Sequence, residues 1–387
     1  MRILIASHSY IVDLNCEKLR QLAQLDPQNQ VMVVVPQTWQ PGGVQNRTIN
    51  APPWQDGNFQ RLPVANVSNN NQAMLMFGWP IVNILRQFQP DIIQVEQGAK
   101  SLAYAQLITL SRLLRLRAKH CLFTWWNLPY ENKFPINWLE RYNLAHTDGL
   151  IAGNQDGVDI LRDHGYQKSA LVMPQLGVDE TLFKPQPQPE LRSQLQINPE
   201  QFVVGFVGRF VAEKGILTLL DALAGLRDQD WILLLLGRGE LQATIQTRAA
   251  ELGMSERLRW VESVPHDQVP DYINAMNCLV LPSETTQQVK TLTAVGWKEQ
   301  FGHVLIEAMA CAVPVIGSDS GEIPHVIDEA RLIFPEGNSR ELGDRLRTLI
   351  TAPDTAKTLG QQGYHRALTH YTNRALAEKQ LLFYQQL

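Results

Sequence analysis

The stretch Val203-Val-Gly-Phe-Val-Gly-Arg-Phe-Val-Ala-Glu-Lys-Gly-Ile216 contains a passage from a strand to a helix. Its first residues form an apolar run, which predicts a buried strand that ends at Gly208. The loop that follows carries Arg209 and Lys214, and an amphipathic segment then predicts a helix from Ile216. Short apolar runs that alternate with longer amphipathic segments are typical of βαβ units and a parallel sheet. The stretch therefore predicts an α/β fold.

The same alternation extends through the rest of the chain. Strands are predicted in the first half at Ile3–Ala6, Val31–Val35, Ile92–Val95, Cys121–Thr124 and Gly149–Ala152. Strands are predicted in the second half at Phe202–Val207, Trp231–Leu236, Leu258–Val261, Cys278–Leu281, Val313–Ile316 and Leu332–Phe334. Amphipathic segments between them predict helices, among them Ser101–Arg117. Each half thus has the elements of a doubly wound sheet of its own.

The 387 residues are enough for two domains at ~100–200 residues each. The segment Lys184-Pro-Gln-Pro-Gln-Pro-Glu190 has three alternating prolines, which exclude a helix interior or a central strand. We therefore expect two Rossmann-like domains, residues 1–184 and 185–365, that face one another across a cleft. The last segment, 366–387, is predicted to be helical and to return to the first domain.

Composition and charge exclude several classes of protein. Hydrophobic residues make up 44% of the chain, so disorder is excluded. The 34 Lys and Arg against 38 Asp and Glu give a net charge of −4, without the basic surplus typical of a nucleic-acid-binding protein. The four cysteines are far apart, which favours buried free thiols in a reducing cytosol. The first residues lack a signal peptide and Trp231–Leu236 is too short to span a membrane, so a cytoplasmic location is expected.

A second informative stretch is Lys298-Glu-Gln-Phe-Gly-His-Val-Leu-Ile-Glu-Ala-Met-Ala-Cys-Ala-Val-Pro-Val-Ile316. Gly302 predicts a turn, and a helix is expected to begin directly after it. The N–H groups of a helix start, here near residues 302–304, favour an anion. Glu299 and Glu307 lie on either side of this turn. Because carboxylates repel a phosphate, we expect them to accept hydrogen bonds from neutral hydroxyls such as those of a sugar.

Arg209 and Lys214 follow the strand that ends at Gly208, and ligands of a doubly wound sheet bind at the carboxyl ends of its strands. Two cations at this place suit a diphosphate, because Arg offers a planar fork and Lys a point charge. Neither half has a G-x-x-x-x-G-K-[ST] sequence or a G-x-G-x-x-G sequence after its first strand. A P-loop protein and a dinucleotide oxidoreductase are therefore not expected.

Together these stretches resemble the family-four glycosyltransferases, retaining enzymes with the GT-B fold that use nucleotide sugars. The Glu-x7-Glu string from Glu299 to Glu307 and the Gly-Arg-x4-Lys-Gly string from Gly208 carry the resemblance. The segments Pro174–Phe183 and Leu281-Pro-Ser283 are similar to the family's linker region and to a strand end before the donor loop. The resemblance covers nearly the whole chain.

The resemblance implies a retaining transfer of a sugar from a UDP- or GDP-linked donor to a carbohydrate or lipid-linked acceptor, in polysaccharide or glycoconjugate synthesis. It implies no cofactor and no metal, and we interpret Asp228-Gln-Asp230 as a solvated turn. The catalytic residues that it implies are Arg209, Lys214 and Glu299. The donor-binding residues that it implies are Gly208, Phe301, Gly302, His303, Val304 and Glu307.

The first half departs from the family pattern. The loop His8–Asn15 has no glycine, and Trp126 or Asn127 stands about where the family has a histidine. The candidate acceptor-side residues are therefore His8, Trp126 and Asn127. The long loop 284–298 is either a lid over the donor or a surface insertion.

The segment Ser111-Arg-Leu-Leu-Arg-Leu-Arg-Ala-Lys-His120 alternates cations with leucines. Such a segment either lies on anionic lipid, as a peripheral protein on the inner membrane face, or packs its leucines inward. Two other functions stay open: a nucleotide-sugar epimerase of the same fold, and a non-catalytic nucleotide-sugar-binding subunit of a polysaccharide assembly complex.

Overall fold

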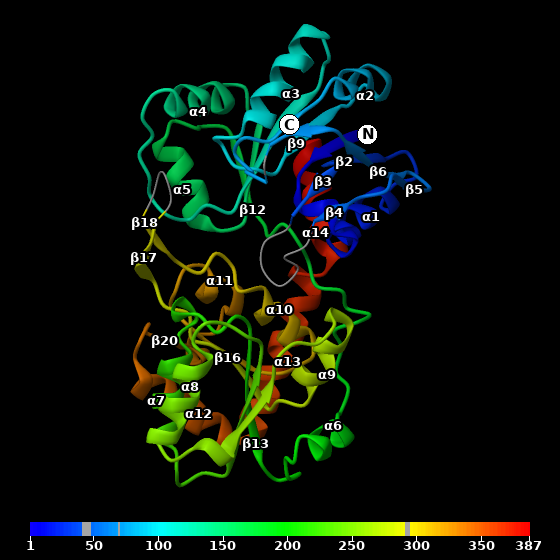
Figure 1. The fold of residues 1–387 in the computed structure, drawn as a ribbon. Coiled ribbons are helices and arrows are strands. Elements are labelled where there is room, and N and C mark those ends of the chain that lie inside the picture. The colour runs from blue at the N-terminus through cyan, green and yellow to red at the C-terminus, as the bar shows by residue number, and fades with distance from the viewer. Residues whose placement is uncertain (41–47, 69, 291–294) are drawn as a thin grey trace. The chain divides into compact units, whose positions relative to one another are not determined.

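The computed structural model describes residues 1–40, 48–68, 70–290 and 295–387. It divides into two compact units, Met1–Gly177 with Asn373–Leu387 and Val178–Thr372, each built around its own sheet (Figure 1). The sequence instead predicted one domain boundary between residues 184 and 185 and another between residues 365 and 366. Val178 belongs to the second unit because its N–H donates to the carbonyl of Tyr371, 2.8 Å away. Phe183 is buried against the ring of His266, so the proline segment begins inside the second unit.

The first unit has an eight-stranded sheet in the order β12-β11-β10-β9-β1-β2-β6-β5, parallel except for the edge strand β5. Its strands are β1 (Arg2–Ala6), β2 (Gln30–Pro36), β5 (Trp54–Asp56), β6 (Phe59–Val64), β9 (Ile92–Val95), β10 (Lys119–Thr124), β11 (Gly149–Ala152) and β12 (Ser169–Val172). The central strands are almost continuously apolar, as parallel strands covered on both faces require. Short two-stranded ribbons pair β3 (Thr38–Trp39) with β4 (Ile49–Asn50) and β7 (Asn66–Val67) with β8 (Met76–Phe77).

Six helices of the first unit lie in the described ranges: α1 (Glu17–Gln24), α2 (Pro80–Phe88), α3 (Leu102–Leu113), α4 (Ile136–Ala145), α5 (Gln155–Asp163) and α14 (Asn373–Gln385). The C-terminal helix α14 packs on α1, and its residues Leu376, Phe383 and Tyr384 are buried in the core of this unit (Figure 1). The predicted return of the chain end to the first domain agrees with this packing.

A buried polar network joins α14 to the carboxyl edge of the first sheet. Tyr384 donates to Gln94 Oε1 at 2.6 Å, and Gln94 Nε2 donates to Glu96 Oε1 at 2.7 Å. Gln175 Nε2 donates to the second oxygen of Glu96 at 2.6 Å. Lys18 is fully buried nearby, where its Nζ makes no hydrogen bond to a described residue and burial lowers its pKa to about 8.

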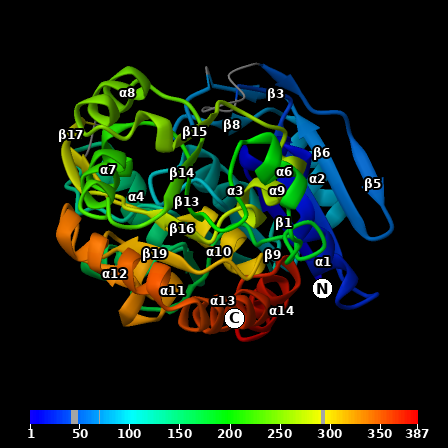
Figure 2. The same ribbon diagram turned by 90° about the horizontal axis from the view of Figure 1, so that it is seen from below.

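The second unit has a six-stranded parallel sheet in the order β15-β14-β13-β16-β19-β20. Its strands are β13 (Phe202–Val207), β14 (Trp231–Leu236), β15 (Leu258–Val261), β16 (Cys278–Leu281), β19 (Val315–Ser318) and β20 (Ile333–Phe334). Its helices are α6 (Pro189–Gln194), α7 (Ile216–Ala224), α8 (Gln242–Glu251), α9 (Val269–Asn274), α10 (His303–Ala310), α11 (Ile323–Ile327), α12 (Ser339–Thr351) and α13 (Pro353–His370). In Figure 2 the strands lie between α7 and α12 on one side and α10 on the other.

The predicted helix Ser101–Arg117 is wrong at its end. Helix α3 stops at Leu113, because Arg115 adopts a left-handed conformation with φ 55° and the N–H of Leu116 turns back to the carbonyl of Ser111. The chain then enters β10 at Lys119.

Strand β19 begins two residues later than predicted, at Val315. The preceding Val313 instead closes the end of α10, because its N–H donates to the carbonyl of Ala308.

Candidate active site

Three segments of the second unit meet at the carboxyl edge of its sheet. Lys214 lies in the loop between β13 and α7, Ser283 follows β16, and Glu299 precedes α10. Lys214 Nζ donates to Glu299 Oε2 at 2.5 Å, and Ser283 Oγ donates to the same oxygen at 2.7 Å. The Glu299 carboxylate is buried and the Lys214 side chain is 16% exposed. A charged pair therefore lies with one side open to solvent.

A turn after β19 holds the backbone of Glu299 in this place. Gly321 has φ 55°, and a Cβ at this residue would lie 1.8 Å from the carbonyl oxygen of Glu299. Ser320 Oγ accepts a hydrogen bond from the Glu299 N–H at 3.4 Å. Because only a glycine allows the two backbones to approach so closely, this turn fixes where the carboxylate begins.

Trp297, the last residue of strand β18 (Val295–Trp297), forms another wall of the cluster. The centre of its ring lies 5.0 Å from Lys214 Nζ, a cation–π distance. The ring and the Glu299 carboxylate together restrain the ammonium group in this structure.

Helix α10 begins at His303, directly after Gly302, as the sequence predicts. Gly302 has φ 81°, and a Cβ there would lie 2.7 Å from a methyl carbon of Leu281. The N–H groups of the first turn of a helix have no partner within the helix, and the helix dipole makes this end positive. The positive end of α10 therefore lies within four residues of Glu299 in the sequence.

Glu307 lies one turn into α10 and differs from Glu299 in its surroundings. It is half-buried, and none of the described residues donates a hydrogen bond to its carboxylate. Burial raises the pKa of Glu307 to about 7. The two predicted carboxylates thus have different environments: Glu299 is held by a cation, and Glu307 has no cationic partner among the described residues.

The other predicted residues of this unit lie around the cluster. Arg209 is 55% exposed and pairs with Glu213 at 3.5 Å, on the same loop as Lys214. Gly208 follows β13 and donates its N–H to the carbonyl of Leu236 at 3.0 Å. Phe301 is buried, with its ring 5.7 Å from that of Tyr371, so its side chain anchors the start of α10 to the end of α13.

The candidate acceptor-side residues lie in the first unit. His8 follows β1, its ring lies 5.1 Å from that of Trp39, and burial lowers its pKa to about 4. Asn127 is buried and Trp126 is half-buried in the loop after β10. Lys100 Nζ lies 5.1 Å from the centre of the Trp126 ring. These residues follow two different strands of the same sheet, at its carboxyl edge.

Sequence reasoning assigned Lys214 to a diphosphate and Glu299 to a sugar, and it missed their direct contact. It also missed Ser283 and Trp297 as members of the cluster.

The sequence did contain a signal for Ser283, since a polar residue two positions after a predicted strand lies at the carboxyl edge of the sheet. Trp297 had no such signal, because it belongs to an antiparallel hairpin that joins β17 (Thr286–Lys290) to β18 (Val295–Trp297). Residues 291–294 of the predicted long loop lie outside the described residues.

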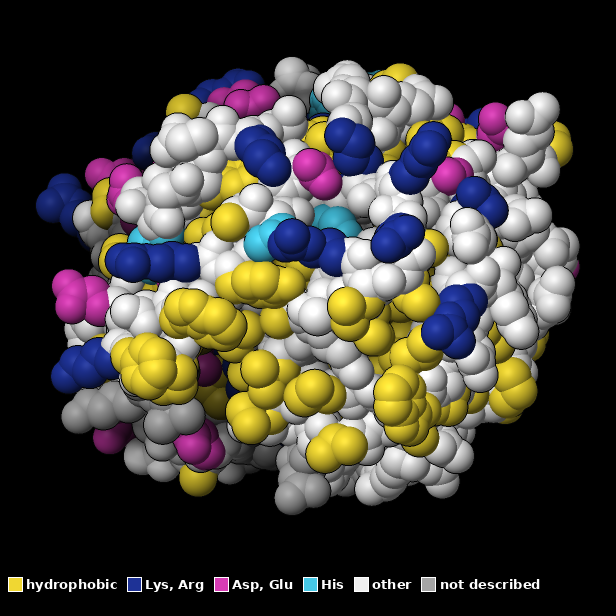
Figure 3. Space-filling model, turned by 90° about the horizontal axis from the view of Figure 1, so that it is seen from above, with side chains coloured by type: hydrophobic (Ala, Val, Ile, Leu, Met, Phe, Trp, Pro, Cys, Tyr) yellow, Lys and Arg dark blue, Asp and Glu magenta, His cyan; other side chains and the backbone are white. Residues whose placement is uncertain are grey.

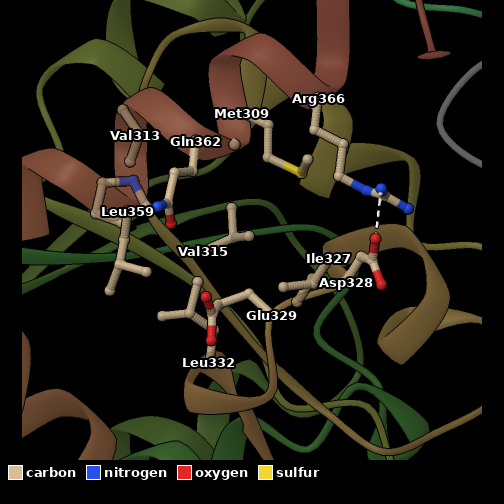
Figure 4. Close-up of a pocket in the computed structure, with 12 residues that line it drawn as sticks. Met309, Val313, Val315, Ile327, Asp328, Glu329, Leu332, Leu359, Gln362 and Arg366 are labelled. Atoms are coloured by element: carbon tan, nitrogen blue, oxygen red, sulfur yellow. Dashed lines mark hydrogen bonds and ion pairs between the residues drawn. The ribbon is translucent and has the colours of Figure 1, made fainter. Parts of the chain in front are cut away.

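A cavity of about 270 Å³ lies elsewhere in the second unit (Figure 4). Met309 of α10, Val315 of β19 and Leu359 of α13 line it, and Arg366 pairs with Asp328 at its rim at 2.7 Å. None of the predicted site residues lines this cavity. It is therefore distinct from the Lys214–Glu299 cluster.

The fold is that of known GT-B proteins. Sucrose-phosphate synthase from Thermosynechococcus elongatus superposes with a TM-score of 0.71 at 20% identity, covering 100% of this chain and 98% of that one. Anabaena HepE in complex with UDP superposes with a TM-score of 0.73 at 19% identity, covering 100% of both chains. At such low identity these likenesses establish the fold alone, and they confirm the two Rossmann-like units expected from the sequence.

Residues 187–366 match the model of the family described as glycosyl transferases group 1. The match confirms the family resemblance found in the sequence. Alpha-maltose-1-phosphate synthase from Mycolicibacterium smegmatis is 26% identical over 65% of this chain and 66% of its own length. D-inositol 3-phosphate glycosyltransferase from Streptomyces bingchenggensis is 27% identical over 59% of this chain and 50% of its own length. The chain thus spans about half to two thirds of the length of these curated relatives.

Proposed function

We propose that this protein transfers a sugar from a nucleotide-diphosphate sugar, UDP- or GDP-linked, to a hydroxyl of a carbohydrate or lipid-linked acceptor. The observation that carries the proposal is the Lys214–Glu299–Ser283 cluster beside the start of α10. It combines a cation and helix N–H groups for a diphosphate with carboxylates for sugar hydroxyls. The group 1 match and the transferase names of the relatives support this reading, as does UDP in the related HepE structure.

In the proposed reaction the anomeric configuration of the donor is retained. The bond between the anomeric carbon and the diphosphate oxygen breaks, and its electron pair stays on the diphosphate. The acceptor oxygen bonds to the same face of the sugar, and the acceptor proton passes to a diphosphate oxygen. Lys214, Arg209 and the N–H groups at the start of α10 would stabilise the negative charge of the leaving group without a metal ion.

Donor binding would rearrange the cluster. The ammonium group of Lys214 would turn from Glu299 to the diphosphate, since its side chain is partly exposed. Ser283 would continue to hold Glu299, which would then accept a hydrogen bond from a hydroxyl of the transferred sugar. Glu307, which has no described hydrogen-bond partner, would accept from the ribose hydroxyls. We assign acceptor binding to the first unit, through His8, Trp126 and Asn127.

A donor screen tests this proposal. The purified chain is incubated with UDP-, GDP- and ADP-sugars while thermal stability and nucleotide release are measured in EDTA. A donor at a hundredfold excess over its Kd should add ~2.7 kcal/mol to the free energy of unfolding. NMR of the product should show the anomeric configuration of the donor.

Each other outcome contradicts a defined part of the proposal. Binding without transfer to any acceptor would indicate a non-catalytic subunit, and conversion of the donor sugar without an acceptor would indicate an epimerase. An inverted product, or activity abolished by EDTA, would contradict the proposed mechanism. If no nucleotide sugar binds, the site assignment itself is wrong.

A further inference from the structure

The outer surface of α3 and α4 exposes large apolar side chains between cations. Figure 3 shows this side of the first unit, where Lys and Arg side chains form a row beside a group of hydrophobic ones. Phe134 is 81% exposed, Leu113 73% and Trp138 63%. The exposed cations are Arg112, Arg115, Arg117 and Arg141. We refer to these seven residues as the α3–α4 face.

Side-chain contacts make the two helices one continuous surface. Tyr142 of α4 and Thr109 of α3 share a hydrogen bond of 2.8 Å, and one turn later Arg112 contacts His146. The Trp138 ring stacks on that of Tyr142, with centres 6.0 Å apart and planes at 20°. From Trp138 to Leu113 the face therefore extends about two helical turns, or ~12 Å at 1.5 Å per residue.

The face is strongly cationic in a chain of net charge −4. Four of its seven residues are arginines and none is a carboxylate. The exposed carboxylate nearest in sequence to Phe134 is Glu131. The positive charge of the face is thus almost uncompensated.

We infer that the α3–α4 face docks on the surface of a lipid bilayer that contains anionic lipids. Aromatic and aliphatic side chains would enter the headgroup region, and the arginines would pair with lipid phosphates. A second copy of this chain fits less well, because a twofold interface would bring the same row of arginines from both copies together. The proposal concerns the first unit alone and does not depend on the donor chemistry.

The residues that we expect to contact lipid differ from those of the basic segment Ser111–His120 that the sequence singled out. Leu114 and Leu116 of the predicted segment Ser111–His120 pack on the core, and His120 is buried in β10. Leu113 alone of these leucines is largely exposed. The apolar part of the face comes instead from the start of α4, more than 15 residues later in the sequence, so no single amphipathic helix carries it.

Flotation of the full chain with lipid vesicles tests the inference. We expect binding to vesicles of phosphatidylcholine with about one third phosphatidylglycerol at low salt, and loss of binding in high salt, because salt screens exposed charges. The double variant Arg115→Glu/Arg117→Glu should weaken binding at least twenty-five-fold, at ~1 kcal/mol or fivefold for each of the two cations removed. Phe134→Ser should weaken it about fivefold to tenfold.

Matched variants of exposed residues elsewhere control for charge and hydrophobicity. Arg340→Glu/Lys357→Glu makes the same change in net charge, and Leu382→Ser removes an apolar side chain that is 59% exposed. Both should bind vesicles like the unchanged chain. The inference is overturned if the chain does not float, if it binds neutral vesicles equally well, or if the controls lose binding as much. It is also overturned if light scattering shows that Arg115→Glu/Arg117→Glu abolishes a dimer instead.

The described helices include none that is both long and apolar enough to span a bilayer. Attachment through the α3–α4 face would therefore be peripheral, and high salt should release the protein from the vesicles without detergent.

Discussion

Glu299 and Glu96 are both buried carboxylates at the carboxyl edge of a parallel sheet, yet their partners differ. Glu299 in the second unit is held by the ammonium of Lys214 and by Ser283. Glu96 in the first unit is held by the amides of Gln94 and Gln175. The first arrangement has a charged partner that is partly exposed, so a ligand can take its place. The second is closed on all sides and ties the helix α14 to the sheet.

We propose that this position in the sheet serves ligand binding in the second unit and assembly in the first. If so, changes around Glu299 should affect the reaction more than stability. Changes around Glu96 should do the opposite.

The largest effect is expected for Lys214→Ala. Loss of one preorganised charge at a developing negative charge typically lowers the rate ~10²–10³-fold, or ~3–4 kcal/mol. Steady-state kinetics with the true donor should show this loss in kcat, because the interaction strengthens as charge develops on the leaving group. Lys214→Arg should recover only part of it, since a planar fork replaces a point charge.

Arg248→Ala is the matched control, because it removes an exposed cation of the same unit that pairs with Asp221. Its kcat should stay unchanged. If the Lys214→Ala enzyme keeps the original kcat, Lys214 is a structural partner of Glu299 only.

The next effect is expected for Glu96→Gln, and on stability. The new amide would place an NH2 group against the donating amide of Gln94 or of Gln175, and two donors cannot form a hydrogen bond. The loss of one buried hydrogen bond to a charged group should lower the free energy of unfolding by about 1.5–3 kcal/mol. Urea denaturation measures the free energy of unfolding, and kcat per folded molecule should change little. If kcat falls and stability does not, the closed network belongs to the reaction.

The buried Lys18 near this network gives a second test, through the pH dependence of stability. Burial lowers its pKa to about 8 in the folded protein, below the 10.5 of an exposed lysine. Between these values the unfolded chain binds a proton that the folded chain has released, so the free energy of unfolding should rise from pH 8 to pH 10.5. Lys18→Met removes the buried charge and should remove that rise. Equal pH dependence in both proteins would contradict a buried, charged Lys18.

The smallest effect is expected at Glu307, on donor binding. Its pKa of about 7 means that the carboxylate is protonated at lower pH and loses its capacity to accept two hydroxyl hydrogen bonds. Affinity for UDP, measured by calorimetry, should fall about tenfold from pH 8 to pH 6, because binding favours the ionised form. Glu307→Gln should bind more weakly and without this pH dependence. A wild-type affinity that does not vary with pH would remove Glu307 from the donor site.

Much of the fold could be predicted from the sequence because apolar runs and turns are local signals. The strand Phe202–Val207 and the helix start at His303 follow directly from such patterns. Strand β12 was missed, since Ser169–Val172 is an edge strand in which Ser169 is exposed and the other residues are half-buried. The helices α12 and α13 were also not predicted, although both are long.

The chemistry of the site was harder to predict than its location. The Glu299–Glu307 string placed both carboxylates beside Gly302, but the contact of Glu299 with Lys214 joins residues 85 positions apart. No local pattern specifies such a pair, because it depends on which strands are neighbours in the sheet. The order β13-β16-β19 brings these loops together, and strand order is not encoded in the period of a single strand.

The helix α14 has a consequence for how the chain is made. Residues 373–387 complete the core of the first unit, yet 195 residues of the second unit, 178–372, are synthesised before them. At ~5–20 residues per second, a ribosome needs roughly 10–40 s to cover that distance. During this interval Gly149 lacks the side chains of Phe383 and Leu387 that later cover it, and Gln94 lacks Tyr384. The first unit is thus completed only after the whole second unit has been synthesised, and an open patch of its core must remain soluble on the ribosome until α14 arrives.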